Sequence, residues 1–416
     1  TSDNTVTAGT LRGIYHYASG TIPTNIKMTN YFNNNNIFLK RKAASASIYG
    51  IHLDNYNDSV TNYVIADTIR GLGSAATNSS AIYGIYHQGT AKNQYFKKNI
   101  FQINTNTSGS VYVLHGGNKI KSNGIQVIDS NRVDLIDKTV AGGTVYFYYS
   151  VSSSDSTVKK YFTNNIIDNV TLTGSTTFYG FYDTDGSSLN SAKKYYSNNV
   201  IKNITGGTSS LYGMYVTYGK YIAINNNIVE NINNGAGIYG IYMGGSYTPQ
   251  IDVYKNKIQS LTTTSGTING IYSNASATGA IVNIYNDTIT GLNSAGSSYG
   301  IQISNGVTTN VYNNLLYDLN SSGTSGTVYG IYANGGTTNN IYNNFISELY
   351  APSSSGSNQI IGISLSYGTT QNVYYNTIYL DGASSGTNFG TSGIYASTSP
   401  TTIVLKNNIV VNNSTP

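Results

Sequence analysis

Tyr-Gly-Ile-Tyr at residues 329–332 and Ile-Tyr-Asn-Asn-Phe-Ile at residues 341–346 are the two halves of a signature that decides the fold. The signature returns thirteen times at intervals of about thirty residues, with one copy of each half in every repeat. A unit of that length, with two short β-rich runs and no helical periodicity, cannot bury a core alone, so neighbouring units must stack. The repeat therefore predicts a solenoid.

The kind of solenoid follows from what the repeat lacks. Leucine-rich repeats need a recurring leucine frame, and propeller blades need about forty residues with four strands. A parallel β-helix fits the repeat better, because each repeat then forms one coil whose strands pair with those of the coils before and after it. We expect an all-β chain of about 13 coils that forms a single domain over residues 1–416.

A polar slot lies two residues before the aliphatic anchor of each second half, and it holds ten Asn, two Asp and one Lys. Asn tolerates left-handed backbone conformations, and stacked Asn side chains can hydrogen-bond from coil to coil. We expect a structural ladder, since a catalytic residue is needed once and not in every coil. The predicted ladder contains Asn35, Asn123, Asn165, Asn199, Asn227, Asn256, Asn314, Asn344, Asn376 and Asn407, with Asp67, Lys98 and Asp287 in the remaining coils.

The Asn-Asn-x-Ile and Gly-Ile-Tyr strings resemble the right-handed parallel β-helix superfamily of bacterial secreted and surface proteins. That superfamily includes pectate lyases, polygalacturonases and adhesins, so the resemblance implies a right-handed coil and leaves both enzymes and inert stalks open. The richness in Asn and Tyr is also similar to repeat-rich surface proteins of Bacteroidota that leave the cell by type 9 secretion. These resemblances imply a secreted or cell-surface protein that meets secretion machinery during export.

Composition points to a polar β-solenoid, because the chain has 45 Gly, 40 Tyr, no Trp and only 9% charged residues. The absence of Cys excludes disulfides and thiolate metal sites. No run of eighteen apolar residues exists, so we expect no membrane span. The chain begins without Met and ends abruptly, which suggests a processed product or a fragment of a longer protein. We expect no cofactor.

Basic residues flank aromatic residues in the first 257 residues, and every basic residue except Lys406 lies there. Stacked coils would turn these pairs into a stripe that could hold an anionic polysaccharide or lipopolysaccharide. The alternative is that the lysines serve solubility and protect strand edges. No nucleic-acid-binding module is present. The predicted binding residues are Lys159, Lys160, Tyr161, Lys193, Lys194, Tyr195, Lys220 and Tyr221.

The tyrosines should also form columns, which stabilise the stack and offer flat faces to sugar rings. One such column is expected at Tyr254, Tyr285, Tyr312, Tyr342 and Tyr374. Which tyrosine of Tyr-Gly-Ile-Tyr faces outward is left open, because a glycine inside a strand often marks a bend that interrupts the alternation of sides.

Two acidic groups could support chemistry. Asp129, Arg132, Asp134 and Asp137 form the densest charged cluster, where a polysaccharide-processing enzyme could place its catalytic residues, although a solvated loop salt bridge is the preferred explanation. The pair Asp183 and Asp185 is expected to cap a turn or to bind a cation weakly.

His52 and His115 occupy the last tyrosine slot of their repeats, two coils apart, which is too far for one zinc ion. We therefore interpret them as aromatic substitutes and expect no metal site. The sequence as a whole predicts a non-enzymatic stalk, filament segment or adhesin that binds surface glycans and could assemble end to end, with a polysaccharide lyase or hydrolase as the alternative.

Overall fold

A computed structural model describes residues 10–18, 26–41, 46–56, 58–74, 79–117, 119–186 and 191–415. The chain forms two compact units: Thr1–Ser209 with Tyr215–Lys220 is unit 1, and Ser210–Met214 with Tyr221–Pro416 is unit 2. Both are parallel β-solenoids, with about 12 turns in total, close to the 13 expected. The described residues form strands and no helix, so no helix among them could span a membrane. The right-handed winding and the single domain stay predictions.

Each turn contributes strands to three stacks, which we name face 1, face 2 and face 3. In unit 1, face 1 contains β1 (Leu11–Ala18), β4 (Ile48–Tyr56), β7 (Ile82–Lys97), β9 (Val111–His115), β12 (Thr144–Ser150) and β16 (Thr177–Asp183). Face 2 contains β2 (Met28–Asn33), β5 (Val60–Ile65), the end of β7, β10 (Lys119–Asp129), β13 (Lys159–Thr163) and β17 (Lys193–Ser197). Face 3 contains β3 (Asn36–Arg41), β6 (Thr68–Ser74), β8 (Ile100–Thr105), β11 (Arg132–Lys138), β14 (Ile166–Ile167), β15 (Val170–Leu172) and β18 (Val200–Thr205).

Unit 2 repeats this arrangement. Face 1 contains β22 (Ile238–Gly245), β25 (Ile268–Ala275), β28 (Ser298–Asn305), β31 (Val328–Asn334), β35 (Ile360–Tyr367) and β38 (Thr391–Ala396). Face 2 contains β20 (Tyr221–Asn225), β23 (Gln250–Tyr254), β26 (Ile281–Tyr285), β29 (Thr308–Tyr312), β32 (Thr338–Tyr342), β36 (Thr370–Tyr374) and β39 (Thr402–Lys406). Face 3 contains β21 (Ile228–Asn234), β24 (Lys257–Thr263), β27 (Thr288–Ser294), β30 (Leu315–Ser321), β33 (Phe345–Ile346), β34 (Leu349–Tyr350), β37 (Thr377–Leu380) and β40 (Ile409–Asn412). The residues of β19 (Leu211–Thr217) are divided between the two units.

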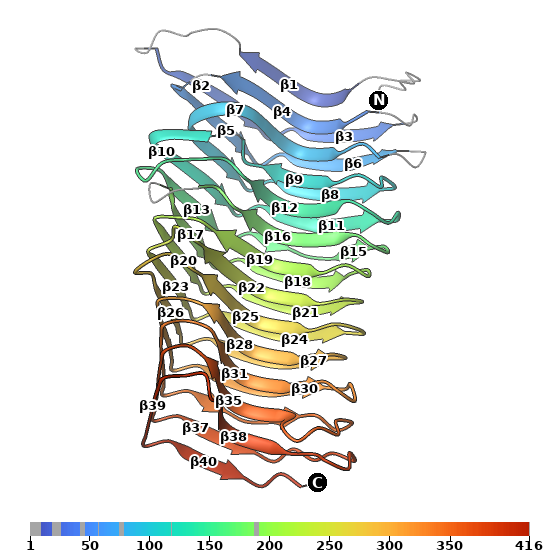
Figure 1. The fold of residues 1–416 in the computed structure, drawn as a ribbon. Coiled ribbons are helices and arrows are strands. Elements are labelled where there is room, and N and C mark those ends of the chain that lie inside the picture. The colour runs from blue at the N-terminus through green and yellow to red at the C-terminus, as the bar shows by residue number, and fades with distance from the viewer. Residues whose placement is uncertain are drawn as a thin grey trace. The chain divides into compact units, whose positions relative to one another are not determined.

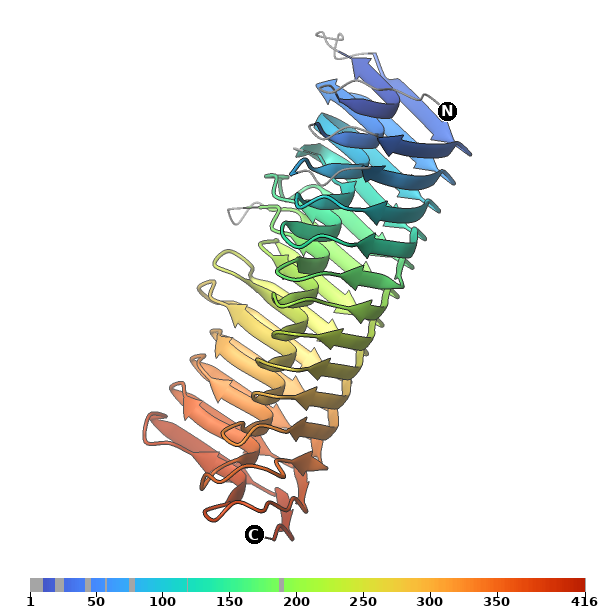
Figure 2. The ribbon, with the colours of Figure 1, turned by 90° about the vertical axis from the view of Figure 1, so that its right-hand side faces the viewer.

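The strands of each stack lie one after the other in chain order. In unit 2, Figure 1 shows β22, β25, β28 and β31 as one such stack, and Figure 2 shows the same succession of strands from a second side. Their pairing keeps equivalent residues opposite one another, so Ile241 pairs with Ile271 and Ile271 with Ile301. All three are fully buried, and such columns of aliphatic side chains form the interior.

The glycine of Tyr-Gly-Ile-Tyr bends the strand and interrupts the alternation of sides. In β22, Gly240 and Ile241 are both buried, while Tyr239 and Tyr242 on either side of them are half-buried. The rings of Tyr239 and Tyr242 lie on the same outer surface, with centroids 5.9 Å apart. The question left open by the sequence is thus answered, because both tyrosines face outward.

Glycine suits this slot because coils approach closely there, although Val113 and Phe147 take its place in two coils. A Cβ atom added at Gly330 would lie 2.6 Å from the backbone oxygen of Gly362 and 2.6 Å from Cγ2 of Ile346. Neither neighbour can move without disturbing the next coil, since one is backbone and the other is a buried anchor.

We expect Gly330→Ala to lower the free energy of unfolding by about 1–3 kcal/mol, as overpacking of a tight interior does. The midpoint of urea denaturation measures it. The exposed substitution Ser355→Ala is the control and should stay within about 0.5 kcal/mol of the parent. An unchanged midpoint for Gly330→Ala would contradict the close approach.

An asparagine ladder joins the coils at the corner before face 3. In unit 1, Asn165 donates from its backbone N–H and from Nδ2 to Oδ1 of Asn199, at 3.1 and 2.9 Å. Its Nδ2 also donates to the carbonyl oxygen of Ile128, at 2.8 Å. Each buried amide is thereby satisfied by the coils on both sides, which makes such a polar network stabilising. The ladder contains Asn35, Asp67, Asn99, Asn131, Asn165 and Asn199 in unit 1, and Asn227, Asn256, Asp287, Asn314, Asn344, Asn376 and Asn408 in unit 2.

Three positions of the predicted ladder were wrong. Asn99 and Asn408 belong to it, not their neighbours Lys98 and Asn407, because Phe101 and Val410 are the residues that pair with the preceding anchors. Lys98 and Asn407 supply instead the left-handed residue that precedes a ladder position, with φ of 56° and 52°.

The third error is larger. Asn123 lies exposed in the long strand β10, and its backbone N–H donates to Oγ1 of Thr157 at 2.6 Å. Asn131 occupies the ladder position of that coil. The extension of β10 moved the corner eight residues further along the chain than the sequence pattern indicated.

Asp287 is an acid in the ladder. Its Oδ1 accepts two hydrogen bonds from Asn256, but Oδ2 is buried and has no partner among the described residues. The equivalent Nδ2 atom of Asn314 donates to a backbone carbonyl, that of Ile284. Burial raises the pKa of Asp287 to about 7, against the opposing effect of the Asn256 hydrogen bonds. A protonated carboxyl can donate where a carboxylate cannot.

We expect Asp287→Asn to stabilise the protein in a pH-dependent way. Between about pH 4 and pH 7 the folded state keeps a proton that the unfolded state has lost, so the free energy of unfolding falls as the pH rises. An Asn side chain does not ionise, so the free energy of unfolding of the variant has no such dependence on pH. Its excess over the parent should grow over this interval to the order of a few kcal/mol. Urea denaturation at several pH values measures it, and an advantage independent of pH would contradict the argument. Asp318→Asn, at an exposed carboxyl, is the control.

Candidate functional site

The predicted basic stripe splits into two layers, because side chains alternate along a strand. Lys159 and Tyr161 of β13 face outward and pair with Lys193 and Tyr195 of β17. The two tyrosine rings stack with centroids 5.1 Å apart. Lys160 and Lys194 face the interior and are fully buried, so their assignment to a surface stripe was wrong.

Of the other two predicted binding residues, Lys220 is exposed in unit 1, and its backbone N–H donates to the carbonyl oxygen of Ala192 at 3.1 Å. Tyr221 belongs to unit 2, where it is half-buried and its hydroxyl donates to Oδ2 of Asp252 at 2.7 Å. The outward basic residues are thus fewer and further apart than the sequence predicted.

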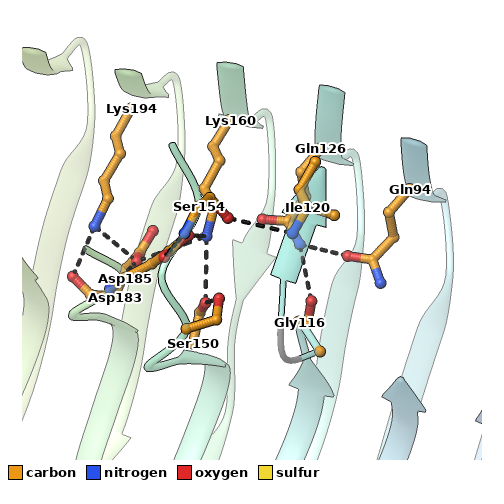
Figure 3. Close-up of polar contacts among 12 residues, drawn as sticks. Gln94, Gly116, Ile120, Gln126, Ser150, Ser154, Lys160, Asp183, Asp185 and Lys194 are labelled. Atoms are coloured by element: carbon orange, nitrogen blue, oxygen red, sulfur yellow. Dashed lines mark hydrogen bonds and ion pairs between the residues drawn. The ribbon is translucent and has the colours of Figure 1, made fainter. Parts of the chain in front are cut away.

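The buried lysines form a charge cluster with Asp183, the last residue of β16, and with Asp185 just after it. Nζ of Lys194 lies 2.8 Å from Oδ1 of Asp183 and donates to the carbonyl oxygen of Thr217 at 2.8 Å. Nζ of Lys160 contacts Oδ2 of Asp185 and lies 3.9 Å from Oδ1 of Asp183. All four charged side chains are fully buried, and their charges sum to zero (Figure 3).

Neutral donors and acceptors complete the cluster. The hydroxyl of Tyr196 donates to Oδ2 of Asp183 at 2.7 Å, and the backbone N–H of Ser154 donates to Oδ1 of Asp185 at 2.7 Å. Oγ of Ser150 lies 3.2 Å from Nζ of Lys160. Figure 3 shows the lysines and the two carboxylates converging on one point inside unit 1.

The charges set one another's protonation. Burial opposes the charge of Lys160, but the carboxylates of Asp183 and Asp185 raise its pKa above the ordinary value. Burial likewise opposes ionisation of Asp183, but Lys160 and Lys194 lower its pKa. Lys194 differs, because burial lowers its pKa and the nearby charge of Lys160 adds to that effect. The cluster thus contains one firmly charged lysine and one whose charge is less well compensated.

The cluster ends a line of inward polar residues on face 2. Gln94, Gln126, Lys160 and Lys194 pair in this order from β7 to β17. Gln126 donates to Gln94 and to the carbonyl oxygen of Gly116, and it accepts from the hydroxyl of Tyr148 at 2.7 Å (Figure 3). Gln126, Lys160 and Lys194 hydrogen-bond to the segment between face 1 and face 2, and the charged side chains make the stronger bonds.

Asp183 and Asp185 were expected to cap a turn or bind a cation weakly. Asp183 does accept from the backbone N–H of Asp185 at 2.9 Å, as a turn cap would. The cations that these carboxylates bind are the ammonium groups of Lys160 on β13 and Lys194 on β17. The sequence signal for this was the Lys-Lys-Tyr run itself, because alternation along a strand turns one lysine of each pair inward.

We expect Lys160→Met to lower the free energy of unfolding by about 3–5 kcal/mol, because it removes the ammonium that compensates the buried carboxylate of Asp185. The adjacent outward substitution Lys159→Met should change it by less than about 0.5 kcal/mol. Urea denaturation of both variants measures the contrast, and equal effects would contradict the two-layer arrangement.

Face 2 of unit 2 carries two outward columns. Asp252, Asn283, Asn310, Asn340 and Asn372 pair in order, and each Asn donates from Nδ2 to the preceding residue of the column at 2.7–2.8 Å. Beside it lie the predicted tyrosines. The rings of Tyr254, Tyr285, Tyr312 and Tyr342 stack at centroid distances of 4.9 Å and within 10° of parallel. The coils of Asn283, Asn310 and Asn340 therefore present the same amide beside the same phenol ring, while the coil of Tyr254 presents the carboxyl group of Asp252.

A groove of about 410 Å³ opens on this surface. It is lined by Asn310, Asn340, Tyr342, Asn343, Tyr374 and Tyr375. Tyr375 is 58% exposed, and the hydroxyl of Tyr374 donates to Oδ1 of Asn372 at 3.0 Å. The groove thus combines flat aromatic walls with amide groups, the usual composition of a small-molecule site that fixes orientation by a few polar contacts.

A second hollow in unit 2 has a volume of about 610 Å³ and borders face 3. Asp318, Tyr350 and Asp381 contribute to its lining. Among the residues that the structure describes, no three His, Cys, Asp or Glu side chains are grouped to hold a metal ion.

His52 and His115 of unit 1 lie among aromatic rings. His52 stacks on Tyr49 with centroids 4.6 Å apart, and the ring of Tyr86 lies between His52 and His115 at 5.0 and 4.6 Å. Burial lowers the pKa of His115 to about 4. His115 therefore adds a neutral ring to the tyrosine column at neutral pH.

The suggested catalytic cluster is spread over two faces. Asp129 ends β10 of face 2 and accepts from Oγ1 of Thr163 at 2.6 Å. Asp134 and Asp137 lie on β11 of face 3, where Asp134 pairs with Arg132. None of the three lines either hollow described above.

Comparison with known proteins adds no relative: no family model, curated protein or solved structure matches the chain.

Proposed function

We propose that this protein is a non-enzymatic, extracellular or cell-surface solenoid that binds a repeating glycan along face 2 of unit 2. The observation that carries the proposal is the groove between Tyr342 and Tyr374, set in two register-matched columns of amides and phenol rings. The scaffold acts as a stalk or adhesin, and the columns supply the contacts.

The chemistry of the groove favours a sugar. Tyrosine rings offer flat apolar faces, and the half-exposed amides of Asn310 and Asn340 offer donors and acceptors beside them. Sugars carry both an apolar ring face and hydroxyl groups, so they match this combination. Because these coils repeat the same pair of groups, weak contacts to successive sugar units add up.

The charge of the region favours a neutral glycan. Beyond residue 257 the acidic residues are Asp287, Asp318, Glu348 and Asp381, and the one basic residue is Lys406. An anionic polysaccharide would find almost no countercharge there. This differs from the sequence-based hypothesis of a lysine stripe, which loses Lys160 and Lys194 to the interior.

The alternative is a polysaccharide-processing enzyme, for which the acidic hollow near Asp318 and Asp381 offers the better location. General acid–base catalysis on a glycosidic bond needs two carboxyl groups on either side of the substrate. Cleavage products therefore distinguish this function from binding alone.

Binding is tested by pull-down with insoluble cellulose, chitin and mannan, and with soluble polysaccharides on an array, at low and high salt. We expect binding to at least one neutral polymer with little dependence on salt. The double substitution Tyr342→Ala with Tyr374→Ala should weaken it by about tenfold or more, since about 1.4 kcal/mol corresponds to that factor.

Tyr379→Ala is the matched control, because Tyr379 is 37% exposed on face 3 of the same unit and does not line the groove. Equal losses for the groove and control variants would contradict the proposed surface. Release of shorter sugars, abolished by Asp318→Asn or Asp381→Asn, would replace the proposal by the enzyme.

A further inference from the structure

The buried cluster of unit 1 places a nucleophile against an electrophile. Nζ of Lys194 lies 2.8 Å from Oδ1 of Asp183, and both side chains are fully buried. Lys194 belongs to β17 and Asp183 ends β16, eleven residues earlier. An amine held against a carboxyl group in a rigid interior gains the advantage of an intramolecular reaction, because its nitrogen is already beside the carboxyl carbon that it attacks.

The carboxyl group of Asp183 is surrounded by donors. Tyr196 donates to Oδ2 at 2.7 Å and the backbone N–H of Asp185 donates to Oδ1 at 2.9 Å. The ammonium of Lys160 lies 3.9 Å from Oδ1. Donors fixed in this way stabilise the negative charge that develops on a carboxyl oxygen when an amine attacks its carbon.

Buried aromatic rings lie beside the amine and the carboxyl group. The ring of Tyr196 stacks on Phe162 with centroids 4.4 Å apart and meets Phe181 edge-on at 5.5 Å, and all three rings are fully buried. In water an amide forms poorly from an ammonium and a carboxylate, but an interior without water favours the product that carries no charge. The remaining pair, Lys160 with Asp185, stays neutral as a pair.

We propose that Lys194 and Asp183 condense into an intramolecular amide bond that covalently joins β16 to β17. One proton passes from the ammonium of Lys194 to the carboxylate of Asp183, and the free amine attacks the carboxyl carbon. The C–N bond forms, the C–O bond to one carboxyl oxygen breaks, and that oxygen leaves as water with the second proton from nitrogen. No oxidant or cofactor takes part.

Several features of the cluster assist this reaction. Burial lowers the pKa of Lys194 against the opposing effect of the Asp183 and Asp185 carboxylates, which eases loss of a proton from its ammonium. Tyr196 is a positioning residue that polarises the carboxyl group. Condensation removes two of four buried charges, so the interior gains from the reaction itself. The inference does not depend on glycan binding.

The test is the mass of the intact, folded chain. We expect a mass lower than that calculated from the sequence by one water molecule, and a proteolytic fragment in which the peptides of Asp183 and Lys194 are joined. The surface pair Lys202 with Asp168, at 3.5 Å and about one-third exposed, serves as an internal control that should remain unlinked. A full calculated mass after incubation of the folded protein overturns the proposal.

Variants assign the atoms. Lys194→Arg keeps the charge but should show the full mass, while Asp183→Asn should form the same link with loss of ammonia in place of water. Tyr196→Phe should slow formation of the link, followed by the mass of the newly synthesised chain as it folds, because an amide that has already formed survives unfolding. Circular dichroism verifies the fold of each variant. A link mapped to Lys160 and Asp185, or one that persists in Lys194→Arg, would also contradict the assignment.

Discussion

The structure depends on one constraint: each coil must place the same hydrogen-bonding groups and side chains at equivalent positions, so that every coil can pair with the one before it and the one after it. In the strands, backbone N–H and C=O groups form hydrogen bonds to the neighbouring coils. The corners between strands lack this regular pairing and need other hydrogen-bond partners. The asparagine ladder meets this need, because Asn165 and its equivalents use both amide hydrogens and the side-chain oxygen across three successive coils. The aliphatic columns, the glycine slot and the outward rings repeat only because this corner holds the register.

The fold was largely predictable, since a repeat of about thirty residues with two β-rich halves leaves few architectures open. The register was less so. Adjacent residues such as Lys98 and Asn99, or Asn407 and Asn408, fit the pattern about equally well, and only strand pairing decides between them. The long strand β10 displaces the corner from Asn123 to Asn131. The sequence did not reveal this displacement, because an insertion in one coil leaves no mark in the local pattern.

The buried cluster illustrates why sites are harder to predict than folds. Alternation along β13 and β17 shows that one lysine of each pair must face inward, but not which one. The answer depends on Asp183 and Asp185, which lie at and just after the end of β16. Their carboxylates reach the lysines only once the turn between face 1 and face 2 has formed. The outward columns of unit 2 were easier, because Tyr254, Tyr285, Tyr312 and Tyr342 repeat in sequence as they do in space.

The stacked tyrosines also give the protein an unusual optical character. The chain has 40 Tyr and no Trp, so no indole collects the excitation energy that phenol rings absorb. Rings held parallel at 4.9 Å exchange that energy along the column before they emit. The folded solenoid should therefore share its excitation among neighbouring rings, and separation of the coils should end that sharing. The emission of the native chain thus reports, without any label, whether its coils are stacked.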